Sequence, residues 1–96
     1  MKHILNDINK AFENKIRLGI MSALVVNRKI DFNTLKELLD VTDGNLASHL
    51  KALEKREYIS VHKEFIGRKP RTQYAATKLG KAEFKKHIRA IEKLIS

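Results

Sequence analysis

The spacing of apolar residues changes twice along this chain of 96 residues. In the first part they recur every four positions, which indicates helix. From Tyr58 they alternate with polar residues, as in β-strands, and after Thr77 the helical spacing returns. A hairpin alone is marginal in water and must pack on the helices. The pattern therefore predicts a mainly α fold with one small β-hairpin.

The first helical stripe predicts a helix from about Asp7 to Val26, and a break near Glu13-Asn14 is left open. The stripe consists of Ile8, Phe12, Ile16, Ile20 and Leu24. Gly19 lies inside it, where glycine costs up to about 1 kcal/mol of helix propensity. Close approach of another element would explain this glycine.

Two shorter helices follow, each with a capping residue. Asn33 is a good N-cap for the stretch TLKELLD, and Thr42 for a helix from Asp43 to about Arg56. The second helix has two different sides. The apolar side consists of Leu46, Ala47, Leu50 and Leu53, and the polar side of Gly44, Ser48, Lys51 and Lys55, with Asn45 beside them. We expect the apolar side to be buried and the polar side to face a polar partner.

The alternating segment divides into two strands around the insert Gly67–Arg71. Gly67 and Pro70 suit a turn, but a turn does not require the three cations of this insert. These cations are Arg68, Lys69 and Arg71. We expect a negative partner opposite the tip, in preference to charges that only aid solubility. Thr77 then caps a last helix over residues 78–95.

The positive charge is concentrated in the second half of the chain. Twenty Lys and Arg against eleven Asp and Glu give a net charge of +9. Residues 1–50 hold seven basic and six acidic residues, and residues 51–96 hold thirteen and five. The halves therefore carry +1 and +8. This polarity favours a polyanionic partner, either nucleic acid or an anionic membrane surface.

Length and composition fit a single domain, residues 1–96. No apolar run approaches the roughly 18 residues of a membrane span, and the N-terminus does not predict a signal peptide. The absence of Cys excludes disulfides and thiolate metal sites and fits a cytoplasmic location. We expect no membrane partner.

Residues for catalysis or metal binding are not convincingly grouped. The serines lack a His–acid partnership, and there is no Gly-rich phosphate loop and no HExxH motif. Glu83 and His87 are four residues apart, a spacing that can hold zinc, but two ligands without Cys favour a surface pair. We therefore expect no enzyme activity, no metal and no cofactor. The sequence does not reveal an effector.

The order helix, helix, helix, strand, wing, strand, helix is typical of a winged helix-turn-helix. The stretch that carries the resemblance is DFNTLKELLDVTDGNLASHLKALEKREYISVHKEFIGRKPRTQYAATKLGKAEF. It resembles winged helix-turn-helix regulators of the MarR and ArsR type, in particular their small stand-alone group. Asp-Gly-Asn-Leu opens the recognition helix, and Thr-x-Tyr-x-x-Thr-x-x-Gly closes the wing. The resemblance covers roughly residues 14–90, with the helix-turn-helix at about 33–56, the wing at about 58–77 and the C-terminal dimerisation helix at about 78–95.

The resemblance implies a homodimer that binds double-stranded DNA, with the recognition helix in the major groove and the wing at the backbone or minor groove. The family often has Gly directly after the recognition helix, where this chain has Glu57, so the geometry of that turn is not predicted. Apolar residues at both ends also favour a dimer built on the terminal helices. They are Ile4, Leu5, Ile8 and Phe12 at one end and Ile88, Ile91, Leu94 and Ile95 at the other.

Nine residues are candidates for DNA contact: Thr34, Asn45, Ser48, His49, Lys51, Lys55, Arg68, Lys69 and Arg71. The lysines and arginines favour phosphate or minor-groove contacts over ordinary solvated charges. Asn45 and Ser48 are of the types that read base edges, and contact with phosphate alone is the alternative. Thr34 opens a helix whose backbone N–H groups can meet a phosphate, or it simply enters the helix. His49 is either a DNA contact or half-buried.

The sequence therefore predicts a homodimeric, sequence-specific DNA-binding regulator of the prokaryotic type. The alternative is a winged-helix interaction module that binds an acidic protein or RNA.

Overall fold

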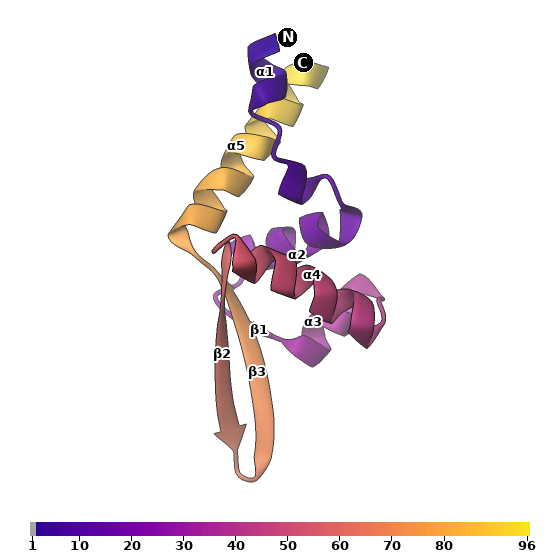
Figure 1. Ribbon diagram of the computed structural model, residues 1–96, viewed down its shortest axis with the longest axis vertical. Coiled ribbons are helices and arrows are strands. Elements are labelled where there is room, and N and C mark those ends of the chain that lie inside the picture. The colour runs from indigo at the N-terminus through magenta and orange to yellow at the C-terminus, as the bar shows by residue number, and fades with distance from the viewer. Residues whose placement is uncertain (1) are drawn as a thin grey trace.

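A computed structural model describes residues 2–96. The molecule is elongated, about 53 × 25 × 21 Å. Figure 1 shows a β-hairpin projecting at one end and the first and last helices side by side at the other. The elements are α1 (Lys2–Asn6), the 3₁₀ helix η1 (Lys10–Phe12), α2 (Lys15–Val26), β1 (Ile30–Asp31), α3 (Phe32–Leu39), α4 (Asp43–Lys55), β2 (Ile59–Ile66), β3 (Lys69–Ala76) and α5 (Lys78–Ile95). The predicted fold class, mainly α with a hairpin wing, is confirmed.

The predicted break in the first helical stripe is present. Asn14 has extended backbone geometry and caps α2, because its side chain accepts hydrogen bonds from the backbone N–H groups of Ile16 and Arg17. The predicted start of this helix at Asp7 is wrong, because α2 begins at Lys15 and Ile8 lies in the segment between α1 and η1. Neither α1 nor η1 was predicted. Thr42 and Thr77 cap α4 and α5 as predicted.

The predicted cap of α3 is wrong. Asp31, not Asn33, precedes the helix, and its Oδ1 accepts the N–H of Thr34 at 3.0 Å. Asn33 lies inside the first turn of α3. Asp31 belongs to β1, so sheet pairing already holds its backbone in the extended geometry that an N-cap requires.

The sheet is antiparallel, with strand order β1-β3-β2. The short strand β1 was not predicted, and it pairs Ile30 with Tyr74. β2 and β3 pair from Ile59–Ala76 out to Ile66–Lys69, so only Gly67 and Arg68 form the turn. The predicted five-residue tip is therefore wrong, because Lys69, Pro70 and Arg71 belong to β3. Pro70 is tolerated there because β1 does not extend to it, which leaves that edge of β3 open.

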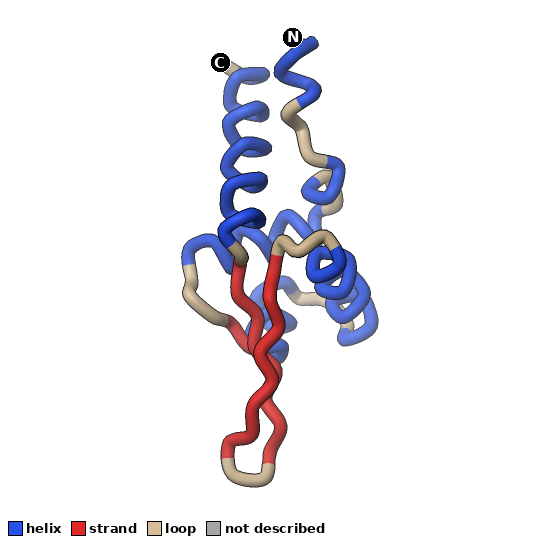
Figure 2. The backbone as a smooth tube through the Cα atoms, turned by 60° about the vertical axis from the view of Figure 1, so that its left-hand side comes forward, coloured by secondary structure: helices blue, strands red, loops and turns tan. Residues whose placement is uncertain are grey.

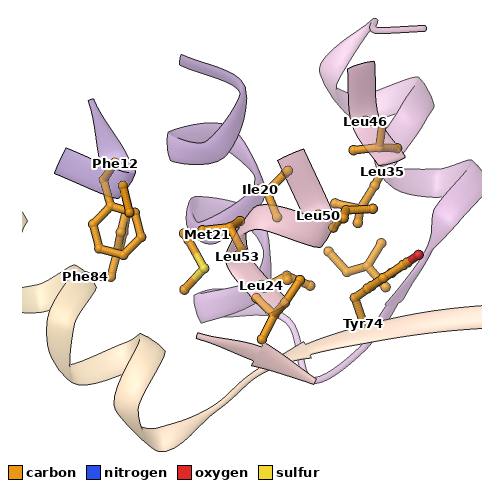
Figure 3. Close-up of a cluster of buried hydrophobic side chains, with 13 residues drawn as sticks. Phe12, Ile20, Met21, Leu24, Leu35, Leu46, Leu50, Leu53, Tyr74 and Phe84 are labelled. Carbon is orange, nitrogen blue, oxygen red and sulfur yellow. The ribbon is translucent and has the colours of Figure 1, made fainter. Parts of the chain in front are cut away.

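One hydrophobic core joins the helices to the base of the hairpin (Figure 3). α2 supplies Ile20, Met21 and Leu24, which are almost completely buried. Around them pack Phe12, Leu35, Leu46, Leu50, Leu53, Ile59, Tyr74 and Phe84. This core fixes α4 and the hairpin relative to each other. The exposed residues of the two elements therefore have a defined position relative to one another.

Two glycines mark close approaches between elements. A Cβ on Gly19 would lie 2.7 Å from Leu39 Cδ2, which confirms that α3 packs closely on α2 at this point. A Cβ on Gly80 would overlap the carbonyl oxygen of Tyr58, so α5 begins directly against the segment that joins α4 to β2. Within residues 2–96 no helix is long and apolar enough to cross a bilayer.

Candidate nucleic-acid interface

α4 presents one buried and one exposed side, as the sequence predicts, except that Ala47, which was assigned to the buried side, is exposed. Leu46, Leu50 and Leu53 are buried in the core. The exposed side is made of Gly44, Asn45, Ala47, Ser48, Lys51, Glu54 and Lys55. Thr42 Oγ1 accepts the N–H of Asn45 at 3.2 Å and so fixes the first turn of this surface. The candidates Asn45, Ser48, Lys51 and Lys55 therefore lie together on one accessible helix surface.

His49 lies between α4 and α2. It is half-buried, and its Nδ1 lies 3.1 Å from Nη1 of Arg17. Since the guanidinium can only donate, Nδ1 accepts this hydrogen bond and carries no proton. Burial and, secondly, the charge of Arg17 lower the pKa of His49. Arg17 belongs to α2, so its hydrogen bond with His49 joins α4 to α2. Arg17 also donates from Nε to the carbonyl of Ala11.

A groove of about 650 Å³ separates α4 from the hairpin. Its walls are Ala47, Leu50, Lys51 and Glu54 from α4, and Val61, Lys63, Thr72 and Tyr74 from the strands. Lys63 and Lys51 thus line the same opening. Lys63 was not among the candidates taken from the sequence. The alternation of β2 was the available signal, because it puts Lys63 on the same face as Val61.

The tip of the hairpin has the geometry of a tight turn. Gly67 has a φ of 65°, and no such positive φ occurs at Arg68, a pattern typical of a type II′ turn. Arg68 is exposed in this turn, and Lys69 is exposed at the start of β3. Both candidates are accessible at the point of the hairpin farthest from the core (Figure 2).

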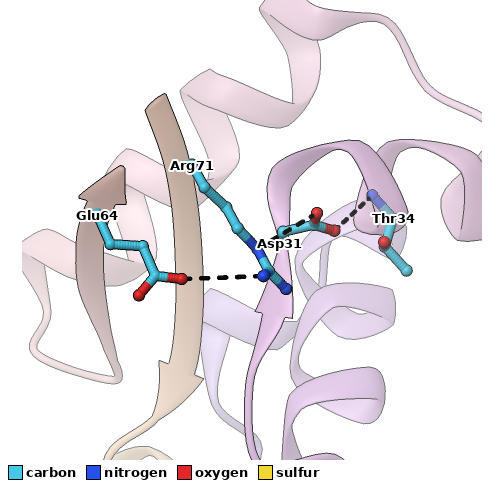
Figure 4. A network of polar contacts seen from close by, with 4 residues as sticks. All are labelled: Asp31, Thr34, Glu64 and Arg71. Atoms are coloured by element: carbon cyan, nitrogen blue, oxygen red, sulfur yellow. Dashed lines mark hydrogen bonds and ion pairs between the residues drawn. The ribbon is translucent and has the colours of Figure 1, made fainter. Parts of the chain in front are cut away.

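Arg71 lies on the opposite face of the hairpin from the groove, since its strand partner is Glu64, whereas Val61 and Lys63 line the groove. Its guanidinium lies 3.9 Å from Asp31 and 3.8 Å from Glu64, so two carboxylates offset its charge (Figure 4). Hydrogen bonds from Thr34 and, to a smaller extent, the charge of Arg71 lower the pKa of Asp31. The structure therefore brings Thr34 and Arg71 together with Asp31, and not with the exposed side of α4.

The backbone N–H of Thr34 is already bound to the carboxylate of Asp31. A phosphate at this position would meet a negative charge before it met the N–H group. The exposed side chain of Thr34 is still accessible. Its proposed role through the backbone N–H has no geometric support, because the N–H is occupied.

His87 is not part of the surface pair that the sequence favoured, because only 1% of it is exposed. Its Nδ1 accepts the backbone N–H of Asn9 at 2.9 Å, and the Asn9 side chain donates to the hydroxyl of Tyr58 at 3.0 Å. Burial lowers the pKa of His87, and Glu13 opposes this only in part. His87 therefore joins α5 to the N-terminal segment. Across residues 2–96, His, Asp and Glu side chains form no group of three or more that could hold a metal ion.

The chemistry of the accessible surface suits an extended anion. Cations stand on α4, in the groove and at the tip of the hairpin, namely Lys51, Lys55, Lys63, Arg68 and Lys69. The exposed residues of α4 before Lys51 are short polar or small, and they would not prevent close approach to a nucleic-acid groove. Glu54 is the acidic exception and lies between Lys51 and Lys55.

The comparisons with known proteins agree with this geometry. Residues 16–95 match the family described as winged helix DNA-binding domain. An uncharacterized protein from Methanocaldococcus jannaschii is 36% identical over 85 residues, which cover 88% of this chain and 92% of that protein. A solved structure of a transcriptional regulator homologue from Pyrococcus horikoshii is 34% identical, with a TM-score of 0.85 over 98% of this chain and 91% of its own.

A more distant structure shares the fold. BpsR from Bordetella bronchiseptica, whose DNA binding is regulated by 6-hydroxynicotinic acid, is 12% identical, with a TM-score of 0.75 over 98% of this chain and 73% of its own. The family match covers most of the chain, and the resemblance to winged helix-turn-helix regulators seen in the sequence is confirmed. This chain belongs to the winged helix DNA-binding domain family.

Proposed function

We propose that the protein is a homodimeric, sequence-specific double-stranded DNA-binding regulator of transcription. The observation that carries the proposal is the exposed side of α4. Within residues 2–96, the side chains of its four candidate residues make no hydrogen bond or ion pair. They are Asn45, Ser48, Lys51 and Lys55. The fold places them on one helix surface without using their side chains, which fits a surface that binds a partner.

Each part of this surface has a distinct role in the proposal. α4 lies in the major groove, where Asn45 and Ser48 contact base edges and Lys51 and Lys55 contact phosphates. Lys63 binds the DNA strand that enters the groove between α4 and the hairpin. Phosphate neutralisation supplies most of the affinity, and base contacts with DNA shape supply the specificity.

The proposed dimer uses the end of the molecule opposite the hairpin. α1 and α5 lie side by side there (Figures 1 and 2). Leu5 is 53% exposed and Ile95 is 82% exposed, although both are apolar. A two-fold axis at this end would bury them and present two copies of α4 to DNA. The Pyrococcus relative, described as a transcriptional regulator homologue, supports the regulatory role.

Selection of genomic DNA fragments by the purified protein tests the proposal. We expect enrichment of a palindromic site whose half-sites lie about one helical turn, ~10 bp, apart. Asn45→Ala and Ser48→Ala should weaken binding to the enriched site more than to random duplex. An equal loss on all sequences would contradict base reading by α4. Preference for RNA or for an acidic protein over every duplex would contradict the proposal as a whole.

A further inference from the structure

Phe65 lies near the tip of the hairpin and has no place in the hydrophobic core. It is 75% exposed, a large value for an aromatic side chain. Its partner across the hairpin is Pro70. The cross-strand partner of the ring is therefore apolar too, and most of the ring surface is in water. Exposed apolar surface beside charged residues can mark a site of interaction.

The strand register places Phe65 on the face of the hairpin that is directed towards α4. Val61 and Lys63 line the groove beside α4, and Phe65 follows Lys63 by two residues. Side chains two apart in a strand point to the same face. Ile66 and Lys69 pair on the opposite face. Phe65 thus continues the DNA-facing side of the hairpin, whereas its neighbour Ile66 does not.

The charges around Phe65 identify the chemistry of the partner. Lys63 precedes it on the same face, and Arg68 and Lys69 are exposed at the tip. The nearest acidic residue in the strand, Glu64, points to the other face and lies 3.8 Å from Arg71. An aromatic ring with one cation on its own face and two more at the adjoining tip fits a polyanion that also offers apolar surface. The minor groove of DNA offers both, in its phosphates and in its sugars and base steps.

The length of the hairpin agrees with a contact in the neighbouring groove. Phe65 follows the buried Ile59 by six residues, or roughly 20 Å of strand at ~3.3 Å per residue. Half a helical turn of B-DNA is about 17 Å. With α4 in the major groove, a hairpin of this length reaches the adjacent minor groove.

We propose that Phe65, supported by Pro70, enters the minor groove beside the site of α4 and partly unstacks one base step. The ring acts as an apolar wedge and bends the duplex, while Lys63, Arg68 and Lys69 bind the flanking phosphates. Sequence preference at this step then arises from its deformability, without a hydrogen bond to a base. This inference rests on the proposed function, because it needs α4 bound in the major groove.

The test compares Phe65→Ala with Ile66→Ala, a neighbouring residue that is 55% exposed on the other face of the same hairpin. The probe is a duplex recovered in the selection experiment, with 2-aminopurine replacing single adenines in turn. Wild type and Ile66→Ala should raise the fluorescence of one analogue position. Phe65→Ala should abolish that rise and bind roughly five- to 100-fold more weakly, the range of aromatic–base stacking. Phe65→Leu should recover part of both signals.

The salt dependence provides a second readout. Phe65→Ala removes no charge, so the slope of log affinity against log salt should equal that of wild type. Unchanged affinity and fluorescence in Phe65→Ala, or equal losses in Ile66→Ala, would overturn the inference while leaving DNA binding intact. Phe65-dependent binding to phosphatidylserine vesicles but not to duplex would also overturn it. Failure of wild type to bind any duplex would instead refute the proposed function on which the inference rests.

Discussion

At the scale of single residues, the end of α4 depends on a residue with unfavourable backbone geometry. Glu57 has a φ of 62°, in the left-handed region. Its N–H donates to the carbonyl of Glu54, and the N–H of Tyr58 donates to that of Leu53. This is a Schellman motif, in which glycine is usual at the left-handed position. The structure thus resolves the departure seen in the sequence, since Glu57 adopts the geometry that the family's glycine provides.

Replacement of this residue should therefore stabilise the protein. Glu57→Gly relieves a backbone strain of about 1–2 kcal/mol, part of which is offset by greater entropy in the unfolded chain. We expect a net gain of roughly 0.5–1 kcal/mol in urea unfolding. Asp40→Gly is the matched control, because Asp40 also has a positive φ, of 51°, but aspartate tolerates it better. A gain at Asp40 larger than that at Glu57 would contradict this account.

Two histidines should make stability depend on pH. Burial lowers the pKa of His87, and burial with the charge of Arg17 lowers that of His49. In the unfolded chain both titrate near pH 6.5. Below that pH the unfolded state takes up protons that the folded state does not, so the free energy of unfolding falls as pH falls. Above it, both are neutral in both states and contribute no pH dependence.

The contribution of His87 can be separated by substitution. His87→Gln keeps a neutral acceptor for the N–H of Asn9 but does not titrate. Melting temperatures measured between about pH 7 and pH 5 should fall less steeply for this variant than for wild type. Identical pH profiles for the two proteins would show that the buried imidazole is not responsible.

At the scale of elements, the sequence did not predict α1, η1, β1, the cap of α3 or the short turn of the hairpin. Thr42 and Thr77 were identified because a hydroxyl before a helical stripe is a local signal. β1 has two residues and exists only through pairing with β3, more than forty positions later. Asp31 takes its extended geometry from that pairing, which the local sequence does not show. The local sequence therefore favoured Asn33 as the N-cap of α3. Similarly, the alternation of the hairpin was visible, but the register that places Arg71 beside Glu64, on the face away from α4, was not.

Substitutions at the start of α3 test the corrected cap. Asp31→Ala should cost about 1 kcal/mol of stability in denaturant unfolding, because it leaves the N–H of Thr34 unpaired and removes a partner of Arg71. Asn33→Ala should stay within about 0.5 kcal/mol of wild type, since Asn33 is exposed inside the helix. The reverse order of these effects would restore Asn33 as the functional cap.

At the scale of the whole molecule, the hairpin tip and the terminal helices lie at opposite ends of the long axis (Figure 1). Both ends carry exposed apolar residues, Phe65 at one and Leu5 and Ile95 at the other. The sequence predicted the excess of positive charge in residues 51–96 and the apolar residues at both ends, because both are countable. It did not show that part of this charge, such as Lys81 and Lys85, lies on α5 and away from α4. The sequence could not predict the groove between α4 and the hairpin, because residues that are distant in the chain form its walls.

The proposed dimer can be tested at its exposed apolar residues. Leu5→Asp with Ile95→Asp places two charges where the partner would pack, so sedimentation at micromolar concentration should change from twice the chain mass to the monomer mass. Val26→Asp is the control, because Val26 is 79% exposed on α2, outside the terminal helices. A wild-type protein that sediments as a monomer would contradict the dimer.

The central claim, that the exposed side of α4 binds DNA phosphates, is tested most directly by a salt series. Duplex affinity is measured for wild type, for Lys51→Ala with Lys55→Ala, and for Lys81→Ala with Lys85→Ala, which removes the same charge from exposed positions on α5. The account predicts that the α4 variant loses roughly two units of the log–log slope per subunit, while the α5 variant keeps the wild-type slope. Equal slopes for the two double variants would contradict it.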